Sequence, residues 1–405
     1  TAKLVPYRAV GNNATLFDQT TARERPLLDP AEAARWLVAL HAYDTGGLKT
    51  PYGREKSSER APCNNFGCVL VEGPTLKDTL LLNMPVYNPA REEPAPTTRV
   101  DRPAWEENPP RPEPEMRSPL GWTDLLTWPS RRILLSPQES PTGTVVDGVI
   151  VTPGTRLRGD LPEMELMAAF HRPPARGRSR ALRPLLPVRL RERRGVWRHS
   201  AELLLAGDQD RQRPRALDHL AERVRAGLIP EHSVYTLRVF GQQLDKNFGA
   251  IECWFEEAVP APVALLRAES SRVGAIIGLG VRLADDVGSA LRRMERDYCT
   301  EFGAEPSSGL DLLYWPHLPQ PFGVFLRQVA EALRAEQSET TALEAWSRAV
   351  RGLAYRAADK WAYGSPRHNR GLFVAGKQHA SFTGLLDYLI KRFHAETTAF
   401  IAARE

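Results

Sequence analysis

The amino-acid sequence predicts an α+β protein in which an irregular mixed α/β domain precedes a C-terminal four-helix bundle. The two predicted domains comprise residues 1–261 and 262–405. Three observations favour this division. Short strand-like and turn-rich segments fill the first part, nine prolines between residues 89 and 119 interrupt it, and apolar residues at helical spacing dominate after Pro262. At 405 residues, the chain is long enough for more than one hydrophobic core.

The first strongly signalled element is a helix that begins after Asp29. Asp29 can cap the helix, Pro30 suits its first position, and Glu32 would complete a capping box. Apolar residues then lie on one face of the helix, namely Trp36, Leu37 and Leu40. Two glycines end the helix, and residues 48–65 are expected to form a mobile polar loop.

Strand-like and proline-rich segments follow this helix. A short strand is predicted at 68–71 and an apolar segment at 76–84. The prolines at 89–119 exclude regular structure, because proline lacks an N–H donor and fixes φ, so an extended tether is expected. Further strands are predicted at 132–135 and 145–151.

A helix and a β-hairpin are predicted to complete the mixed domain. The helix is expected near 215–226, and the hairpin strands at 234–240 and 250–256, with the loop 241–249 between them. The first helix after Pro262 carries an apolar stripe that comprises Val273, Ile277, Ala284, Val287, Leu291 and Met294. Three further helices, which would complete the bundle, are expected at 320–336, 340–362 and 380–403.

Basic side chains are unevenly distributed along the chain. The net charge is only +5, but ten arginines and one acidic residue lie between Arg172 and Arg198. This strip favours a polyanionic partner, because guanidinium groups bind phosphate well, although a solubilising surface is the alternative. The four cysteines fit a reducing compartment, no signal-peptide pattern is recognised in the sequence, and no apolar run is long enough to span a membrane. A cytoplasmic protein without a membrane partner is therefore predicted.

No motif in the sequence indicates catalysis. Gly371 to Lys377 fits the phosphate-loop spacing G-x-x-x-x-G-K, but Gln378 replaces the Ser or Thr that binds magnesium, and no buried strand precedes the motif. A basic loop between helices is expected there, and a nucleotide-binding enzyme is the alternative. Cys63 and Cys68 form a single pair, whereas a structural zinc site needs four ligands. The sequence therefore predicts no metal site, no cofactor and no enzymatic activity.

The predicted hairpin loop carries chemistry suited to nucleic-acid binding. Asn247 can read the acceptors of the minor groove, Lys246 can neutralise phosphate, and Phe248 can insert between bases. Asp245 lies in the same glycine-bounded loop. A polar hairpin turn without a binding role is the alternative.

A tryptophan-rich block carries a resemblance to a known family. It has the patterns D-x-P-x-W-E at 101–106 and L-T-W-x-S-R-R-I-x-L at 126–135, and the segment N-N-A-T-L-F-D stands at 12–18. Over nearly the whole chain, these motifs resemble the large subunit (CasA family) of the type I-E CRISPR surveillance complex, Cascade. The block is expected to anchor the tether through Trp105, Trp122 and Trp128, with structural or subunit contacts from Arg131 and Arg132.

The resemblance implies several groups of binding residues. A first loop near the 5′ end of the guide RNA would contain Asn12, Asn13, Leu16, Phe17 and Asp18. A segment along the PAM, the short motif that flanks the target, would contain Gly46, Gly47 and Lys49. The minor-groove reader and wedge would be Lys246, Asn247 and Phe248, where the family more often has Asn-Gln-Ala, and Asp245 beside them would also belong to the DNA-binding loop. The nearest residues to the family's lysine finger are Arg156 and Arg158.

The resemblance also implies a function. The chain would be a non-catalytic subunit that recognises the PAM in duplex DNA, promotes strand separation and R-loop formation, and helps to recruit a helicase–nuclease. Its partners would be the CRISPR guide RNA, target double-stranded DNA, the backbone, 5′-end cap and small subunits, and that helicase–nuclease. Basic loops of the bundle would guide the separated strands through Lys360, Arg367, Arg370 and Lys377. A general basic RNA-binding scaffold without PAM reading is a further alternative.

Overall fold

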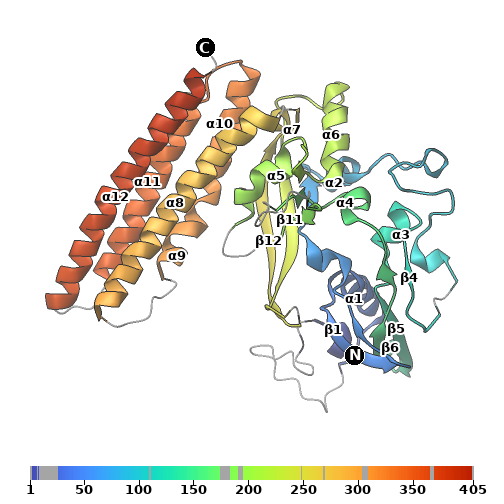
Figure 1. Cartoon of the computed structure of the whole chain (residues 1–405). Helices are drawn as coiled ribbons and strands as arrows, with labels where there is room; N and C mark the ends of the chain where they lie inside the picture. Colours follow the sequence, from blue (N-terminus) through green and yellow to red (C-terminus); the bar gives the residue numbers. More distant parts are fainter. Residues whose placement is uncertain are drawn as a thin grey trace.

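The structure is a computed structural model with an α+β fold. It describes residues 2–6, 8, 26–108, 111–173, 183–189, 195–247, 249–267, 270–302, 309–364 and 369–403. Short strands, short helices and irregular segments form one side of the molecule, and long helices form the other (Figure 1). A long β-hairpin lies between the two sides (Figure 1). Within the described residues, no helix has an apolar stretch long enough to cross a membrane.

The first helix, α1 (Pro30–Tyr43), begins where the sequence predicts. The Asp29 carboxylate accepts hydrogen bonds from the N–H groups of Ala31 and Glu32, each at 2.9 Å. These bonds satisfy two of the donors that the first turn of a helix leaves free. Glu32 accepts a hydrogen bond from Trp36 Nε1 at 3.3 Å, so its carboxylate faces the next turn of the helix.

Residues 48–65 do not form the mobile loop that the sequence predicts. β1 (Gly47–Tyr52) and β2 (Glu55–Ser58) form an antiparallel hairpin, and η2 (Pro62–Asn65) follows it. Gly53 has a φ of +58° in the two-residue connection, a conformation that glycine adopts without a Cβ clash. The side chains of both strands are largely exposed, so the sequence has no apolar alternation that could have revealed them.

The central sheet has three antiparallel strands in the order β12–β11–β3. These strands are β3 (Cys68–Glu72), β11 (Val234–Leu244) and β12 (Ile251–Pro262). The hairpin strands are longer than predicted, so the connecting loop is 245–250 and not 241–249. Gly241 lies within β11 opposite Phe255, whose ring occupies the space that a Cβ at position 241 would need. A ring that covers an interior glycine keeps the strand regular.

The other predicted elements of the mixed part are present. The strands at 132–135 and 145–151 belong to a longer hairpin, β5 (Arg131–Ser140) and β6 (Gly143–Pro153). α6 (Arg215–Arg225) confirms the helix near 215–226. The remaining short elements are η1 (Ala2–Leu4), α2 (Leu76–Asn83), α3 (Trp122–Leu126), β7 (Arg156–Leu157), α4 (Leu161–Met164), β8 (Phe170–His171), β9 (Leu186–Pro187), η6 (Val196–His199), α5 (Ser200–Leu204), β10 (Arg211–Gln212) and α7 (Val263–Arg267).

The proline-rich stretch 89–119 is mainly irregular, but it is not free of regular structure. It contains η3 (Pro89–Arg91), η4 (Ala104–Glu106) and β4 (Met116–Arg117). Pro89 occupies the first position of η3, where a missing N–H costs nothing. β4 pairs in parallel with β7, which attaches the end of the stretch to the mixed part.

One of the tryptophans that are expected to anchor the tether does not do so. Trp128 is 3 % exposed and donates from its indole N–H to the carbonyl of Thr155 at 3.1 Å. Trp105 is 73 % exposed. The chain beside it is held instead by a hydrogen bond from the N–H of Ala104 to Thr127 Oγ1 at 2.8 Å. A hydrogen bond from the backbone to a side-chain hydroxyl therefore fixes the chain at this point without burial of the indole ring.

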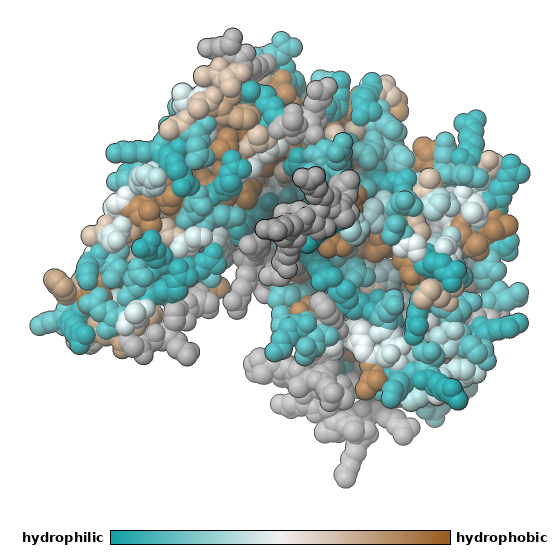
Figure 2. Space-filling view, viewed as in Figure 1, coloured by the Kyte–Doolittle hydropathy of each residue, from teal (hydrophilic) through white to brown (hydrophobic). Residues whose placement is uncertain are grey.

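Four long helices form the C-terminal side. They are α8 (Ser270–Phe302), α10 (Pro319–Arg334), α11 (Thr340–Tyr363) and α12 (Asn369–Ala402), with α9 (Gly309–Tyr314) and η7 (Trp315–His317) between the first two. α8, α11 and α12 contact one another, and α10 contacts α11, α7 and β12. α12 begins at Asn369, well before the predicted start at 380. Hydrophilic residues predominate on the face of the molecule drawn in Figure 2.

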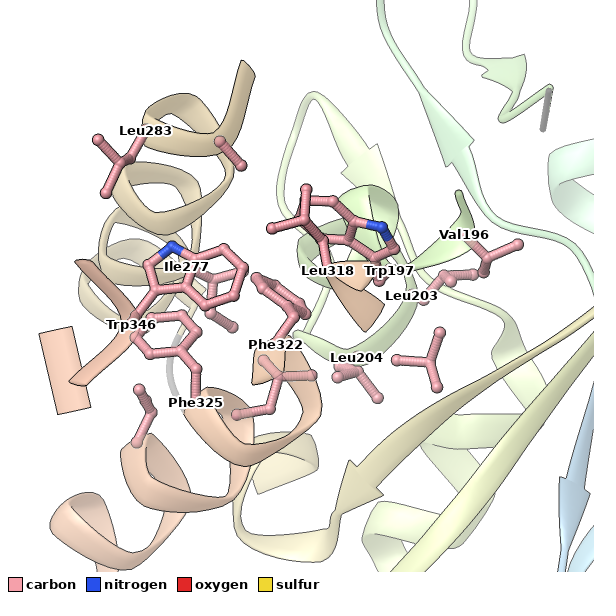
Figure 3. Packing of buried hydrophobic residues seen from close by; sticks show 14 of the residues in the cluster. Val196, Trp197, Leu203, Leu204, Ile277, Leu283, Leu318, Phe322, Phe325 and Trp346 are labelled. Carbon is pink, nitrogen blue, oxygen red and sulfur yellow. The ribbon is translucent and has the colours of Figure 1, made fainter. Parts of the chain in front are cut away.

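The main hydrophobic core joins the long helices to the hairpin. Trp346 of α11 lies 5.2 Å from Phe322 and 5.8 Å from Phe325 of α10, measured between ring centroids (Figure 3). Trp197 of η6 lies 4.7 Å from Phe322. The same core includes Leu237 of β11. The division of the chain at residues 261 and 262 stays a prediction.

Candidate nucleic-acid interface

The loop between β11 and β12 is built on Asp245. Its carboxylate accepts hydrogen bonds from the N–H groups of Gly249 at 2.7 Å, Ala250 at 3.0 Å and Asn247 at 3.3 Å. These N–H groups, that of Ala250 first, hold the pKa of Asp245 below its ordinary value. Lys246 and Asn247 are exposed. Asp245 therefore holds the loop together, while Lys246 and Asn247 are presented to solvent.

Some of the predicted binding residues lie outside the described residues. They are Phe248, Arg367 and the guide-end loop that contains Asn12, Asn13, Leu16, Phe17 and Asp18. Residues 174–182 and 190–194 of the arginine strip also lie outside them. The roles expected for all of these residues stay predictions.

Gly46 precedes β1, and Gly47 is its first residue, in a backbone conformation that favours glycine. Gly47 has a φ of +108°, and no atom of the described residues lies within 4 Å of the position that a Cβ would take. The backbone there is open to close approach by a ligand. A Cβ on Gly46 would lie 3.3 Å from Cγ of Arg60. The Arg60 side chain therefore packs on this segment, which nothing in the sequence indicates.

Lys49 belongs to a cluster of charged groups. Its ammonium lies 2.8 Å from the Asp44 carboxylate, and its side chain is 13 % exposed. Arg131 pairs with the same carboxylate and donates to the carbonyls of Thr45 and Glu59. Burial lowers the pKa of Lys49, and Asp44 opposes this effect. The cluster ties the end of α1 to β1 and β5, and a contact between Lys49 and DNA stays a prediction.

Arg156 and Arg158 lie on and just after β7. The Arg156 guanidinium is 3.0 Å from the Glu55 carboxylate of the β1–β2 hairpin. The N–H of Arg158 donates to the carbonyl of Arg117 at 2.8 Å, and its side chain is exposed. Assignment of either residue to the lysine-finger position stays a prediction.

Two cavities meet at Arg60. One, of about 200 Å³, is lined by parts of β2, β6 and β7, including Arg156. The other, of about 360 Å³, lies at the base of the β11–β12 loop and is lined by Gln242 and Lys246 among others. Arg60 and Asn65 line both cavities. Residues from three segments that are distant in sequence are thus brought together around one basic side chain.

The basic residues predicted to lie in loops of the bundle lie on helices where the structure describes them. Lys360 is exposed in the last turn of α11, and Arg370 and Lys377 are on the first turns of α12. The Arg370 guanidinium lies 5.4 Å from the ring centroid of Phe302, and the Lys377 ammonium lies 3.6 Å from Glu301. These residues gather where α8 ends and α12 begins.

The segment with phosphate-loop spacing, Gly371 to Lys377, is helical. It lies within α12 and not in the inter-helix loop expected from the sequence. Beyond the first turn of a helix, each backbone N–H donates to a carbonyl four residues earlier and cannot surround a phosphate. The nucleotide-binding alternative therefore has no phosphate loop to support it.

The described ends of the arginine strip form contacts within the protein. Arg172 pairs with Asp210 at 3.1 Å. Arg198 pairs with Asp285 of α8, and its guanidinium lies 4.6 Å from the ring centroid of Trp315. Among the described residues, no group of three or more His, Cys, Asp or Glu side chains is arranged to hold a metal.

Comparisons with known proteins assign the chain to a family. Fold and site together define an α+β protein that groups basic and amide side chains around a hairpin loop. The chain belongs to the family of CRISPR-associated protein Cse1, whose model matches residues 1–357. This result confirms the resemblance to the CasA family that the tryptophan-rich block indicates.

Similar proteins cover most of the chain. CasA/Cse1 of Thermus thermophilus is 29 % identical over 416 residues, which span 95 % of this chain and 75 % of that protein. The crystal structure of Thermobifida fusca Cse1 has a TM-score of 0.74 and 27 % identity, over 92 % of this chain and 73 % of that one. A chain of a CRISPR RNA-guided surveillance complex has the same fold, with a TM-score of 0.59 and 22 % identity over 88 % of this chain and 69 % of that one.

Proposed function

We propose that this chain is the large, non-catalytic subunit of an RNA-guided DNA surveillance complex and that it recognises the PAM in duplex DNA through the minor groove. The observation that carries the proposal is the junction at Arg60, where the glycine segment, the cavity beside Arg156 and the base of the hairpin loop meet. Family membership supports it, as does the shared fold with a chain of an RNA-guided surveillance complex.

The exposed loop residues suit contact with the minor groove. The Asn247 amide offers a donor and an acceptor to base edges, and Lys246 offers a positive charge to the phosphate backbone. Phe248 would insert between bases as a wedge. Gly47 lets the backbone approach the duplex closely. Because the minor groove mainly distinguishes A·T from G·C pairs, such a site would read a short motif and leave longer sequences to guide pairing.

The two parts of the chain would have different tasks. The mixed part, residues 1–261, would read the PAM and open the first base pair, and guide pairing would then extend the R-loop. The helices of 262–405 would form a four-helix bundle whose basic end guides the separated strands through Lys360, Arg367, Arg370 and Lys377. The subunit would also help to recruit the helicase–nuclease that cuts the DNA.

The reader assignment is tested with the double variant Asn247→Ala plus Phe248→Ala in the assembled, guide-loaded complex. We expect affinity for PAM-bearing duplex to fall about tenfold or more, because base contacts contribute roughly 1–3 kcal/mol each, with little change for PAM-lacking duplex. Asn108→Ala, an exposed amide elsewhere, is the matched control. Equal losses for the two duplexes would contradict the assignment.

A second variant separates PAM reading from general binding. It removes the positive charges of Arg189, Arg191, Arg193 and Arg194, and it should weaken binding to all duplexes alike and flatten the salt dependence. A basic RNA-binding scaffold would behave differently. In that case the loop variant would not change the relative affinities of the complex for PAM-bearing and PAM-lacking duplex, whereas the charge variant would abolish retention of RNA.

A further inference from the structure

The cavity at the base of the β11–β12 loop is lined by buried amide groups that lack partners. Gln242 is 8 % exposed, and neither Nε2 nor Oε1 has a hydrogen-bond partner among the described residues. Asn64, also 8 % exposed, donates through Nδ2 to the carbonyls of Tyr43 and Asp44, but its Oδ1 has no partner there. Buried polar groups are nearly always hydrogen-bonded in folded proteins. Both side chains line one cavity, and a rotation of the amide groups would turn the unpartnered atoms towards a ligand that supplies the missing partners.

The same cavity has basic groups in its lining. Arg60, Arg189 and Lys246 line it. Burial, followed by the charge of Arg189, lowers the pKa of Arg60. The two acidic residues in the lining have donors: Asp245 binds the loop N–H groups, and Glu252 accepts from Gln243 at 2.6 Å. Two guanidinium groups in the lining of one cavity suit an anionic ligand.

The size and apolar lining of the cavity suit a flat organic group. Its volume of about 360 Å³ lies in the range of small-ligand sites, and Phe66 and Phe255 are part of the lining. Inorganic phosphate would use the arginines but leave the amides and rings without a role. A purely apolar ligand would leave the buried amides unsatisfied. A nucleotide has an edge with donors and acceptors, an apolar face and an anionic group.

We propose that this cavity receives one unstacked nucleotide. Gln242 and Asn64 hydrogen-bond the edge of the base, and the guanidinium groups of Arg60 and Arg189 bind its phosphate. The inference rests on the proposed role of the neighbouring loop in strand separation, which would release unpaired nucleotides beside the cavity. Gln242 is then a specificity residue that lies beneath the loop and not at its tip.

The test is calorimetric titration of the full chain with deoxyribo- and ribonucleoside 5′-monophosphates and, separately, with inorganic phosphate. We expect saturable binding of a nucleotide that inorganic phosphate at the same concentration does not displace. Gln242→Leu keeps the side-chain size and should weaken that binding about tenfold, the effect of a lost bidentate base contact. Gln328→Leu is the matched control, because Gln328 Oε1 on α10 also lacks a partner among the described residues and lies outside the cavity lining.

Arg189→Met, a change at an exposed position, gives a second variant in which folding is not at risk. It should also weaken nucleotide binding. The inference is overturned by the absence of saturable binding, by displacement with inorganic phosphate, or by equal affinities in the Gln242 and Gln328 variants. A preference for deoxyribose identifies a DNA strand as the source of the nucleotide, and a preference for ribose identifies the guide RNA.

Duplex binding, measured on the same preparation, keeps this inference distinct from the proposed function. Selective binding of PAM-bearing duplex without nucleotide binding would support the proposed function and contradict the nucleotide site. Nucleotide binding that depends on Gln242, without PAM selectivity, would support the nucleotide site and contradict the proposed PAM reading.

Discussion

Two almost fully buried side chains show how differently the two sides of the molecule are held together. Arg131, in the mixed part, is 3 % exposed and bonds to the Asp44 carboxylate and to the carbonyls of Thr45, Glu59 and Ser130. Trp346, in the helical part, is 1 % exposed and lies among aromatic rings (Figure 3). Short strands and irregular segments leave backbone carbonyls without partners, which guanidinium groups then bond. Long helices bond their own backbone, so apolar contacts between side chains dominate.

Two other buried arginines follow the same rule. Arg132 donates to the carbonyls of Arg111 and Pro129 and to Thr155 Oγ1. Arg213, 2 % exposed, donates to the carbonyls of Leu204 and Leu266 where the mixed part meets the helices. Arg131 and Arg132 thus stabilise the fold by bonding to backbone carbonyls. The tryptophan-rich block that carries the family resemblance therefore contains structural residues.

The largest expected effect is in the helical part. Trp346→Ala should lower the free energy of unfolding by about 4 kcal/mol, because it leaves a cavity among rings and removes a hydrogen bond from Trp346 Nε1 to the carbonyl of Gly280. The measurement is urea-induced unfolding. Tyr363→Ala is the control on the same helix. Because Tyr363 is 86 % exposed, its loss should change the free energy of unfolding by less than about 0.5 kcal/mol. A similar small loss in both variants would refute the apolar side of the comparison.

The mixed part should contain two opposed pH-dependent contributions to stability. Burial, followed by the charges of Arg131 and Arg132, lowers the pKa of His41 from 6.5 to about 4, and its Nδ1 has no partner among the described residues. Burial raises the pKa of Glu165 from 4.5 to about 7, although the N–H of Met167 opposes this. The contribution of His41 is lost as pH falls from 6.5 towards 4. That of Glu165 is present below pH 4.5 and is lost as pH rises towards 7.

Single variants should separate these contributions, each of which is on the order of 3 kcal/mol. Between about pH 7 and pH 4.5, Glu165→Gln should lose stability on acidification, because only His41 then titrates against folding. In His41→Gln only Glu165 titrates over this range, so acidification from about pH 7 to pH 4.5 should raise the free energy of unfolding more than it does in the wild type. Urea unfolding at both pH values is the measurement. Identical pH dependence in the two variants and the wild type would show that neither group contributes as the geometry implies.

Loss of a buried guanidinium should have a smaller effect. Arg131→Met removes the donor to the carbonyls of Thr45, Glu59 and Ser130, while Asp44 keeps its pairing with Lys49, so we expect a loss of about 2 kcal/mol. Arg158→Met, at an exposed position, should change stability by less than about 0.5 kcal/mol. Thermal unfolding of both variants checks this. If Arg131→Met behaved like its control, the polar side of the comparison would be wrong.

The smallest expected effect is in the hairpin between the two sides. Gly241→Ala should cost about 1 kcal/mol, because the Phe255 ring occupies the space of the new Cβ and must rotate away. At Gly249, no atom of the described residues lies within 4 Å of an added Cβ, so Gly249→Ala is the matched control. Unfolding midpoints compare the two. A larger loss for Gly249→Ala would contradict the strand assignment of Gly241.

Local signals in the sequence predicted some elements well and others poorly. α1 could be located from its cap and its apolar spacing, and α6 from local sequence pattern, because both signals act within a few residues. The β1–β2 hairpin was missed because its exposed strands have no apolar alternation. Gly241 resembles a turn residue in the sequence, and only the ring of Phe255 on the neighbouring strand shows that it lies in a strand. The candidate site was predicted at the hairpin loop, but Arg60 was not.

The sequence by itself determined the family, the presence of α1, α6 and the long helices, and the position of Lys246 and Asn247 between two hairpin strands, because each depends on residues that are close along the chain. Only the tertiary structure decided that Arg60 packs on Gly46 and that Asn64 and Gln242 line one cavity. Sheet pairing and burial bring these residues together across long sequence separations. No local pattern records such distances, because the energy of the contacts comes from groups that meet only after folding.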